Sequence, residues 1–207
     1  MAFGDFKYPD VFQQLGLTFD NADNLFTTVA PMAASTLLRQ QLRITAPLAS
    51  TINTEKARSE WLVAPVLADF WARYHGRIGL YSGVTFVADA AAGLNGYCDY
   101  LVSRSPQQFV IAPPVLVAFE AKNESIPGGL GQCIAGMVGA QRYNRRLGMP
   151  EEPIYGCVTT GTAWRFLRLD AATVTLDLTE YGITEVDQLL GILAYIVGPP
   201  PAPAAAA

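Results

Sequence analysis

The sequence predicts an α/β domain with a central mixed β-sheet flanked by helices. A helical pattern precedes three β-rich stretches, a second helical pattern follows them, and further strands and a final helix complete the order. The chain has 207 residues, of which 51% are hydrophobic and 15% charged, so it can bury a sizeable core and is too apolar to stay disordered. We therefore expect one folded core domain.

The first fifty residues carry no regular pattern, because proline, glycine and asparagine interrupt each short apolar run. We expect residues 1–52 to form an arm or short helices packed on the core, and this region is a candidate homodimer contact. Residues 53–198 form the core domain in this interpretation. Residues 199–207 are rich in proline and alanine and are expected to form a disordered tail.

Within the core domain the first helix begins after Asn53 or Thr54, which are good N-cap residues, and Pro65 is expected to kink it. The strands that follow are rich in Val, Phe, Tyr and Leu and are separated by glycine, asparagine and proline. The expected elements are a helix over 55–76, an antiparallel meander over 78–89, 96–104 and 115–122, a helix ending near 147, strands over 154–160, 164–169 and 174–178, and a helix over 184–197.

Charge, cysteine content and hydropathy exclude several classes of protein. A net charge of −4 argues against a protein whose whole surface binds nucleic acid. A local basic patch is still compatible with the sequence, because residues 122–146 carry four cations and one carboxylate. Three widely spaced cysteines fit neither a disulfide framework nor a zinc site, so we expect buried thiols. With no secretion signal and no apolar stretch long enough to span a bilayer, we expect a cytoplasmic protein without a membrane partner.

The segment VLVAFEAKNE, residues 115–124, is the one most indicative of chemistry. Five apolar residues lead into Glu120 and Lys122, whose side chains leave the same face of the expected strand. Asp99 lies among apolar residues of the preceding strand, where a hairpin would bring it beside Glu120. Two carboxylates and a lysine at one sheet edge suit a divalent metal ion, with the lysine orienting or deprotonating a water molecule.

The same residues allow a plainer interpretation. In it Glu120 and Lys122 form a modest surface ion pair, and Asp99 starts a turn. The apolar lead-in to Glu120, the position of Asp99 in the preceding strand and the flanking glycines favour the metal site over this alternative.

Two short motifs resemble those of the PD-(D/E)xK nuclease superfamily, whose core is the restriction-endonuclease-like fold. They are Gly96-Tyr97-Cys98-Asp99 and Phe119-Glu120-Ala121-Lys122, with a glutamate-bearing helix before them and the helix GLGQCIAGMVGAQRYN after them. The resemblance covers roughly residues 55–155, and Cys98 stands where the family name has proline.

The resemblance implies a metal-dependent nuclease that hydrolyses DNA phosphodiester bonds. Asp99 and Glu120 would bind Mg²⁺ or Mn²⁺ together with the backbone carbonyl of Ala121. Lys122 would position the attacking water and stabilise charge on the phosphate.

The resemblance also implies a helix glutamate, for which Glu55 and Glu60 are candidates. At 100° per residue Glu60 lies at the border of the apolar stripe, whereas Glu55 falls on another face and suits a first-turn anion. We therefore expect Glu60 at the site. The alternative is that Glu60 only pairs with an arginine at the edge of the helix.

The second helix supplies one glutamine and three arginines as further candidates. Gln132 follows the glycine turn after Lys122 and is expected to face the site, whereas Gln141 shares the apolar stripe and is expected at the core edge. The arginines either contact phosphates beyond the scissile one or form a solvated helix end: Arg142, Arg145 and Arg146.

Two other functions compete with nuclease activity. A nuclease-like fold with little or no turnover would serve as a nucleic-acid-binding or regulatory module, which the acidic net charge favours. An interaction protein with incidental charges at its strand ends is the third interpretation.

Overall fold

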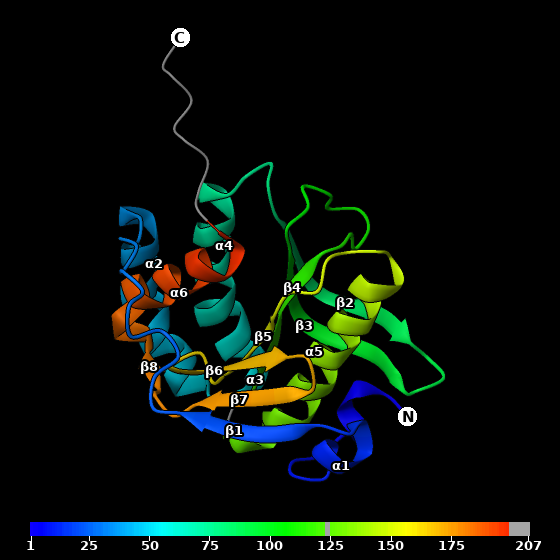
Figure 1. Cartoon of the computed structure of the whole chain (residues 1–207). Coiled ribbons are helices and arrows are strands. Elements are labelled where there is room, and N and C mark those ends of the chain that lie inside the picture. Colours follow the sequence, from blue (N-terminus) through cyan, green and yellow to red (C-terminus); the bar gives the residue numbers. More distant parts are fainter. Residues whose placement is uncertain (123–124, 199–207) are drawn as a thin grey trace.

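The computed structural model describes residues 1–122 and 125–198, so the predicted tail lies outside the described residues. Its centre is one mixed sheet, and the α/β class with a central mixed sheet flanked by helices is confirmed (Figure 1). The strands are β1 (Thr18–Ala22), β2 (Gly79–Asp89), β3 (Leu94–Ser103), β4 (Val115–Ala121), β5 (Ile154–Thr159), β6 (Ala163–Asp170), β7 (Thr173–Asp177) and β8 (Tyr181–Gly182). Their order is β1-β7-β6-β5-β4-β3-β2, with β8 paired to β6.

Helices cover both faces of this sheet. They are η1 (Phe3–Asp5), α1 (Val11–Leu15), α2 (Thr36–Ile52), α3 (Glu55–Arg58), the π-helical turn η2 (Ser59–Val63), α4 (Ala64–Arg73), α5 (Pro127–Arg146), η3 (Ile183–Glu185) and α6 (Val186–Val197). One core lies under α2, α4 and α6, and the other lies under α5 with η1 and α1 (Figure 1). Within the described ranges no helix is long and apolar enough to cross a bilayer.

The predicted meander is confirmed, because β2 pairs with β3 and β3 with β4, both antiparallel. β5 pairs in parallel with β4, and α5 supplies the long crossover that a parallel pair requires. This crossover places the N-terminal end of α5 directly behind the C-terminal end of β4.

Residues 1–52 contain more regular structure than the sequence pattern predicts. The helix α2 has 17 residues and is capped by Ser35, whose hydroxyl accepts a hydrogen bond from the Leu38 N–H at 3.0 Å. The strand β1 pairs in parallel with β7 at the edge of the sheet. Its residues are mostly exposed, so it lacks the apolar alternation by which a half-buried strand is recognised.

The helix predicted over residues 55–76 is irregular, and its irregularity begins before Pro65. The π-helical turn η2 separates α3 from α4, and Pro65 follows it near the start of α4. Pro65 has no N–H to donate to the carbonyl of Trp61, and the Thr45 hydroxyl of α2 donates to that carbonyl at 2.7 Å. This bond ties α2 to the turn that carries the helix glutamates.

The buried Asn144 links the end of α5 to the start of β4. Its side-chain oxygen accepts a hydrogen bond from the Val115 N–H, and its amide donates to the Val115 carbonyl, each at 2.8 Å. Because Asn144 is only 5% exposed, water cannot replace these bonds without opening the core.

We expect Asn144→Ala to lower the free energy of unfolding by about 3 kcal/mol, because it leaves the buried N–H and carbonyl of Val115 without hydrogen-bond partners. Gln141→Ala, which removes a surface hydrogen bond to the Ala171 carbonyl, is the matched control and should cost under about 1 kcal/mol. Urea denaturation followed by circular dichroism measures both. Equal losses for the two variants would contradict this role of Asn144.

Candidate active site

The site forms where the pairing of β3 with β4 stops. The last backbone pair joins Tyr100 to Phe119. Beyond it, the Asp99 carboxylate Oδ2 accepts a hydrogen bond from the Ala121 N–H at 2.7 Å. On the other side of β4, the Lys122 N–H donates to the Thr159 carbonyl of β5 at 2.8 Å. A side-chain carboxylate thus takes the place of the next strand carbonyl and holds Asp99 against the end of β4.

Glu120 and Lys122 lie on the α5 face of β4, as the strand alternation predicts. A methyl group added at Gly129 of α5 would come within 3.2 Å of both side chains, so this glycine lets the helix lie close to them. The Lys122 Nζ lies 2.5 Å from the Glu120 Oε1 and 3.7 Å from a carboxylate oxygen of Glu55. The Glu120 side chain is 4% exposed, whereas that of Lys122 is 24% exposed.

Burial disfavours the charged forms of both strand carboxylates, and the charge of Asp99 further disfavours that of Glu120. Burial raises the pKa of Glu120 to about 8, the negative charge of Asp99 adds to this, and the Lys122 ammonium opposes it. Burial also raises the pKa of Asp99, against the Ala121 N–H and Lys122, which lower it. Burial lowers the pKa of Lys122, but the hydrogen bond and charge of Glu120, with Glu55 and Asp99, outweigh it and raise the pKa overall.

Two hollows adjoin these residues. The first, called here the Asp99 hollow, is open and is lined by Glu55, Lys56, Ser59, Glu60, Ser82, Gly83, Tyr97, Asp99, Tyr100 and Ala121. The second, called the Glu120 cavity, is small and is lined by Phe3, Tyr97, Cys98, Ala118, Phe119, Glu120, Gln132, Cys133 and Gly136. Asp99 and Glu120 therefore line different hollows, and Tyr97 lines both.

Glu55, and not Glu60, makes the ion pair with Lys122. Glu60 also lines the Asp99 hollow, but its carboxylate lies 3.3 Å from the Lys56 ammonium and its side chain is 54% exposed. The expectation of Glu60 assumed a regular helix, and the π-helical turn that begins at Ser59 changes the angle between successive residues. The helix glutamate closest to the site's lysine is therefore Glu55.

The structure brings Gln132 to the Glu120 cavity, at the start of α5. Gln141 lies elsewhere, and its amide donates to the Ala171 carbonyl at 2.8 Å. The two glutamines thus separate as the helical spacing predicts.

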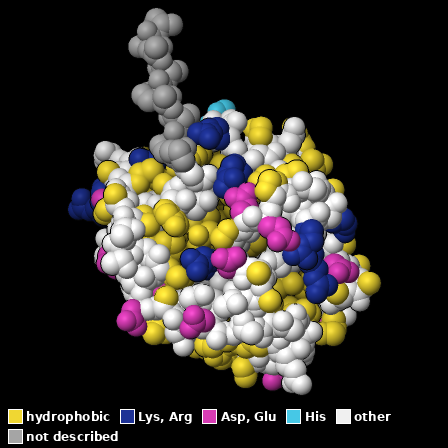
Figure 2. Space-filling view, in the orientation of Figure 1, with side chains coloured by type: hydrophobic (Ala, Val, Ile, Leu, Met, Phe, Trp, Pro, Cys, Tyr) yellow, Lys and Arg dark blue, Asp and Glu magenta, His cyan; other side chains and the backbone are white. Residues whose placement is uncertain are grey.

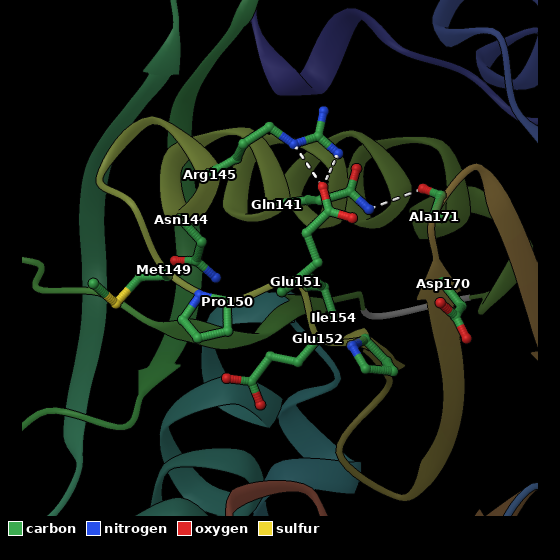
Figure 3. A pocket seen from close by; sticks show the side chains of 11 residues that line it. Gln141, Asn144, Arg145, Met149, Pro150, Glu151, Glu152, Ile154, Asp170 and Ala171 are labelled. Atoms are coloured by element: carbon green, nitrogen blue, oxygen red, sulfur yellow. Dashed lines mark hydrogen bonds and ion pairs between the residues drawn. The ribbon is translucent and has the colours of Figure 1, made fainter.

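The three arginines at the end of α5 are not brought to the site. Arg142 is separated from Gly129 by 13 helical residues, which is about 20 Å along the axis. Arg142 pairs with Asp89 at 2.8 Å, and Arg146 donates to the Ala88 carbonyl at 2.7 Å. Figure 3 shows Arg145 turned to Glu151, from which it lies 2.7 Å, in a separate hollow at this end of the helix. All three are engaged with the protein itself.

The oxygen atoms near Asp99 are of the kind that bind a hard divalent cation. They comprise two carboxylates whose charges burial destabilises, and the Ala121 carbonyl, which by strand geometry points to the same side as the Ala121 N–H. In the described part of the chain no group of three or more His, Cys, Asp or Glu side chains could hold a metal ion by itself. The three cysteines are free and buried, as predicted.

No protein-family model matches the chain, and no curated protein matches it at a significant level. Functional inference therefore rests on the site itself. The sequence patterns drew attention to Asp99, Glu120 and Lys122 but not to Tyr97 or Tyr100, which also line the Asp99 hollow. Tyr100 bonds to the Ser59 hydroxyl at 2.8 Å, and so joins β3 to the π-helical turn.

The raised pKa of Glu120 predicts a specific pH dependence of stability in the presence of chelator. Between the ordinary pKa of 4.5 and the raised value of about 8, the folded protein holds a proton at Glu120 that the unfolded chain releases. The free energy of unfolding therefore falls as pH rises through this window. Glutamine does not titrate, so the free energy of unfolding of Glu120→Gln should not fall in this way. The difference in free energy of unfolding, variant minus wild type, should therefore increase with pH.

Urea denaturation at a series of pH values measures the difference, and Glu151→Gln, at the far end of α5, is the matched control. Parallel stability curves for wild type and Glu120→Gln would contradict the assignment.

Proposed function

We propose that the protein is a metal-dependent nuclease of the PD-(D/E)xK type that hydrolyses DNA phosphodiester bonds. One observation carries the proposal: where β3 and β4 stop pairing, the Asp99 carboxylate binds the Ala121 N–H, which lies between Glu120 and Lys122, and these two side chains pair with each other. The order of the surrounding elements supports it, since a helix, a three-stranded antiparallel meander, a helix and a parallel strand follow one another along the chain.

Each residue of the site has a role that its position supports. Asp99, Glu120 and the Ala121 carbonyl are the atoms that would hold Mg²⁺ or Mn²⁺. The bound ion would supply Lewis-acid stabilisation of the phosphate and acidify a water molecule. Lys122 carries an ammonium that can hold this water and offset charge on the phosphate, and Glu55 keeps the lysine directed at the site.

A structural ion pair between Glu120 and Lys122 accounts for fewer of the observations. Such a pair needs no second or third carboxylate, yet Asp99 is fixed beside it and Glu55 reaches Lys122 from a helix. Burying two carboxyl groups near a single lysine costs stability, because either their excess negative charge is buried or Glu120 must hold a proton. Excess buried carboxylate is what a site for a divalent cation requires, and this favours the nuclease.

A binding module without turnover is the second candidate. The observation in its favour is that the Lys122 ammonium forms an ion pair with the Glu120 carboxylate. This pair must open before Glu120 can bind a metal ion. This candidate predicts DNA binding that is independent of Mg²⁺, without strand cleavage.

Cleavage of plasmid and oligonucleotide DNA with Mg²⁺, Mn²⁺ or chelator tests the proposal. We expect metal-dependent cleavage by wild type, and a loss of about 100-fold or more in both Asp99→Asn and Lys122→Ala. The two variants should differ in metal binding: Mn²⁺ should still raise the melting temperature of Lys122→Ala, because its two carboxylates remain, but not that of Asp99→Asn. Glu151→Gln is the carboxylate control.

Wild-type cleavage by a folded Lys122→Ala protein would remove the lysine from the reaction. A full Mn²⁺-induced shift in Asp99→Asn would remove Asp99 from the metal ligands. Absence of cleavage by wild type under every metal condition would contradict nuclease activity.

A further inference from the structure

The Asp99 hollow has an exposed aromatic ring at its mouth. Tyr97 lies two residues before Asp99 in β3 and is 61% exposed. It lines both the Asp99 hollow and the Glu120 cavity, so it borders the spaces next to both strand carboxylates. Of the large apolar side chains that are exposed in the described ranges, Tyr97 is the one that lines the Asp99 hollow.

The neighbouring strand makes room for this ring. Gly83 of β2 has a φ of +63°, and a methyl group added there would lie 2.7 Å from the Tyr97 hydroxyl oxygen. A side chain at position 83 would therefore displace Tyr97. Among the residues that the structure describes, none forms a hydrogen bond or ring contact with the side chain of Tyr97, although other exposed rings such as Tyr195 pack on a neighbour. The ring is held close to the site yet remains available to a ligand.

The charges around the Asp99 hollow are unsuited to binding a duplex through its phosphates. Among the described residues that line the hollow, Glu55, Glu60 and Asp99 are acidic and Lys56, which pairs with Glu60, is the one cation. The nearby Lys122 is itself paired with Glu120 and Glu55. The face seen in Figure 2 has Lys and Arg side chains interspersed with Asp and Glu, and it shows no broad basic surface. Duplex binding depends on neutralising many phosphates, whereas binding of single strands also gains from stacking of bases on aromatic rings.

We propose that Tyr97 stacks on an unpaired base next to the scissile phosphate, and that the substrate is single-stranded DNA or a single-stranded segment of it. This inference rests on the proposed nuclease function and adds its substrate class. A base stacked on Tyr97 places the adjoining phosphate over the strand ends where Asp99 and Ala121 lie. Stacking compensates for the scarcity of cations at the hollow.

The test compares cleavage of one 5′-labelled oligonucleotide as a single strand and as a blunt duplex with Mn²⁺. We expect wild type to cut the single strand at least about 10-fold faster. Tyr97→Ala should lower kcat/KM on the single strand by about 5-fold to 100-fold, the range that loss of one stacked base gives. Tyr97→Phe keeps the ring and should stay close to wild type, as should Phe109→Ala, a control at a ring that is 99% exposed elsewhere.

Binding of a fluorescent oligothymidylate to the 207-residue chain in chelator separates this inference from the nuclease itself. If wild type cuts neither form, the nuclease proposal fails, and stacking is then judged by binding alone, where Tyr97→Ala should bind about 5-fold or more weakly than Tyr97→Phe. Equal binding by these two variants would overturn the role of Tyr97. Faster cutting of the duplex, or equal cleavage by Tyr97→Ala and Phe109→Ala, would overturn it while leaving the nuclease in place.

Discussion

The hydrogen bond from the Ala121 N–H to the Asp99 carboxylate is the contact on which the arrangement of the site depends. It continues the pairing of β3 with β4 one step beyond the last backbone pair, using a side chain where a carbonyl would stand. Since the next N–H, that of Lys122, bonds to Thr159 of β5, the end of β4 is held from both neighbouring strands. This fixes the Ala121 carbonyl and the starting direction of the Lys122 side chain before any ligand is present.

Packing of α5 behind β4 sets the electrostatics of the same residues. The helix lies close to the sheet because Gly129 has no side chain, and it shields Glu120 from water. Shielding disfavours the charged form of Glu120, and nearby Asp99 disfavours it further. A fold that buries two acidic groups beside one lysine pays for this in stability, and such sites are found where charge is needed for function. The open hollow beside Asp99 gives a ligand access to these groups.

The sequence predicted the core elements well because most of them have a regular hydrophobic period. The meander and α5 have this property, and the position of Glu120 and Lys122 on one face follows from strand alternation alone. The same reasoning could not find β1, an exposed edge strand whose partner, β7, is more than 150 residues away. It also chose Glu60 over Glu55, because an extra residue in the π-helical turn cannot be seen in an apolar pattern. Arg142 and Arg146 of α5 bond to the end of β2, more than 50 residues earlier in the sequence, and no local pattern identifies such partners.

The position of a bound metal ion tests the central claim most directly. Crystals of the wild-type protein grown with Mn²⁺ and measured near the manganese absorption edge would locate the ion by its anomalous scattering. The account predicts a peak bonded to carboxylate oxygens of Asp99 and Glu120 and to the Ala121 carbonyl, with the Glu120–Lys122 ion pair opened. A map without manganese at this place, in which Glu120 keeps Lys122 as its partner at saturating Mn²⁺, would contradict it.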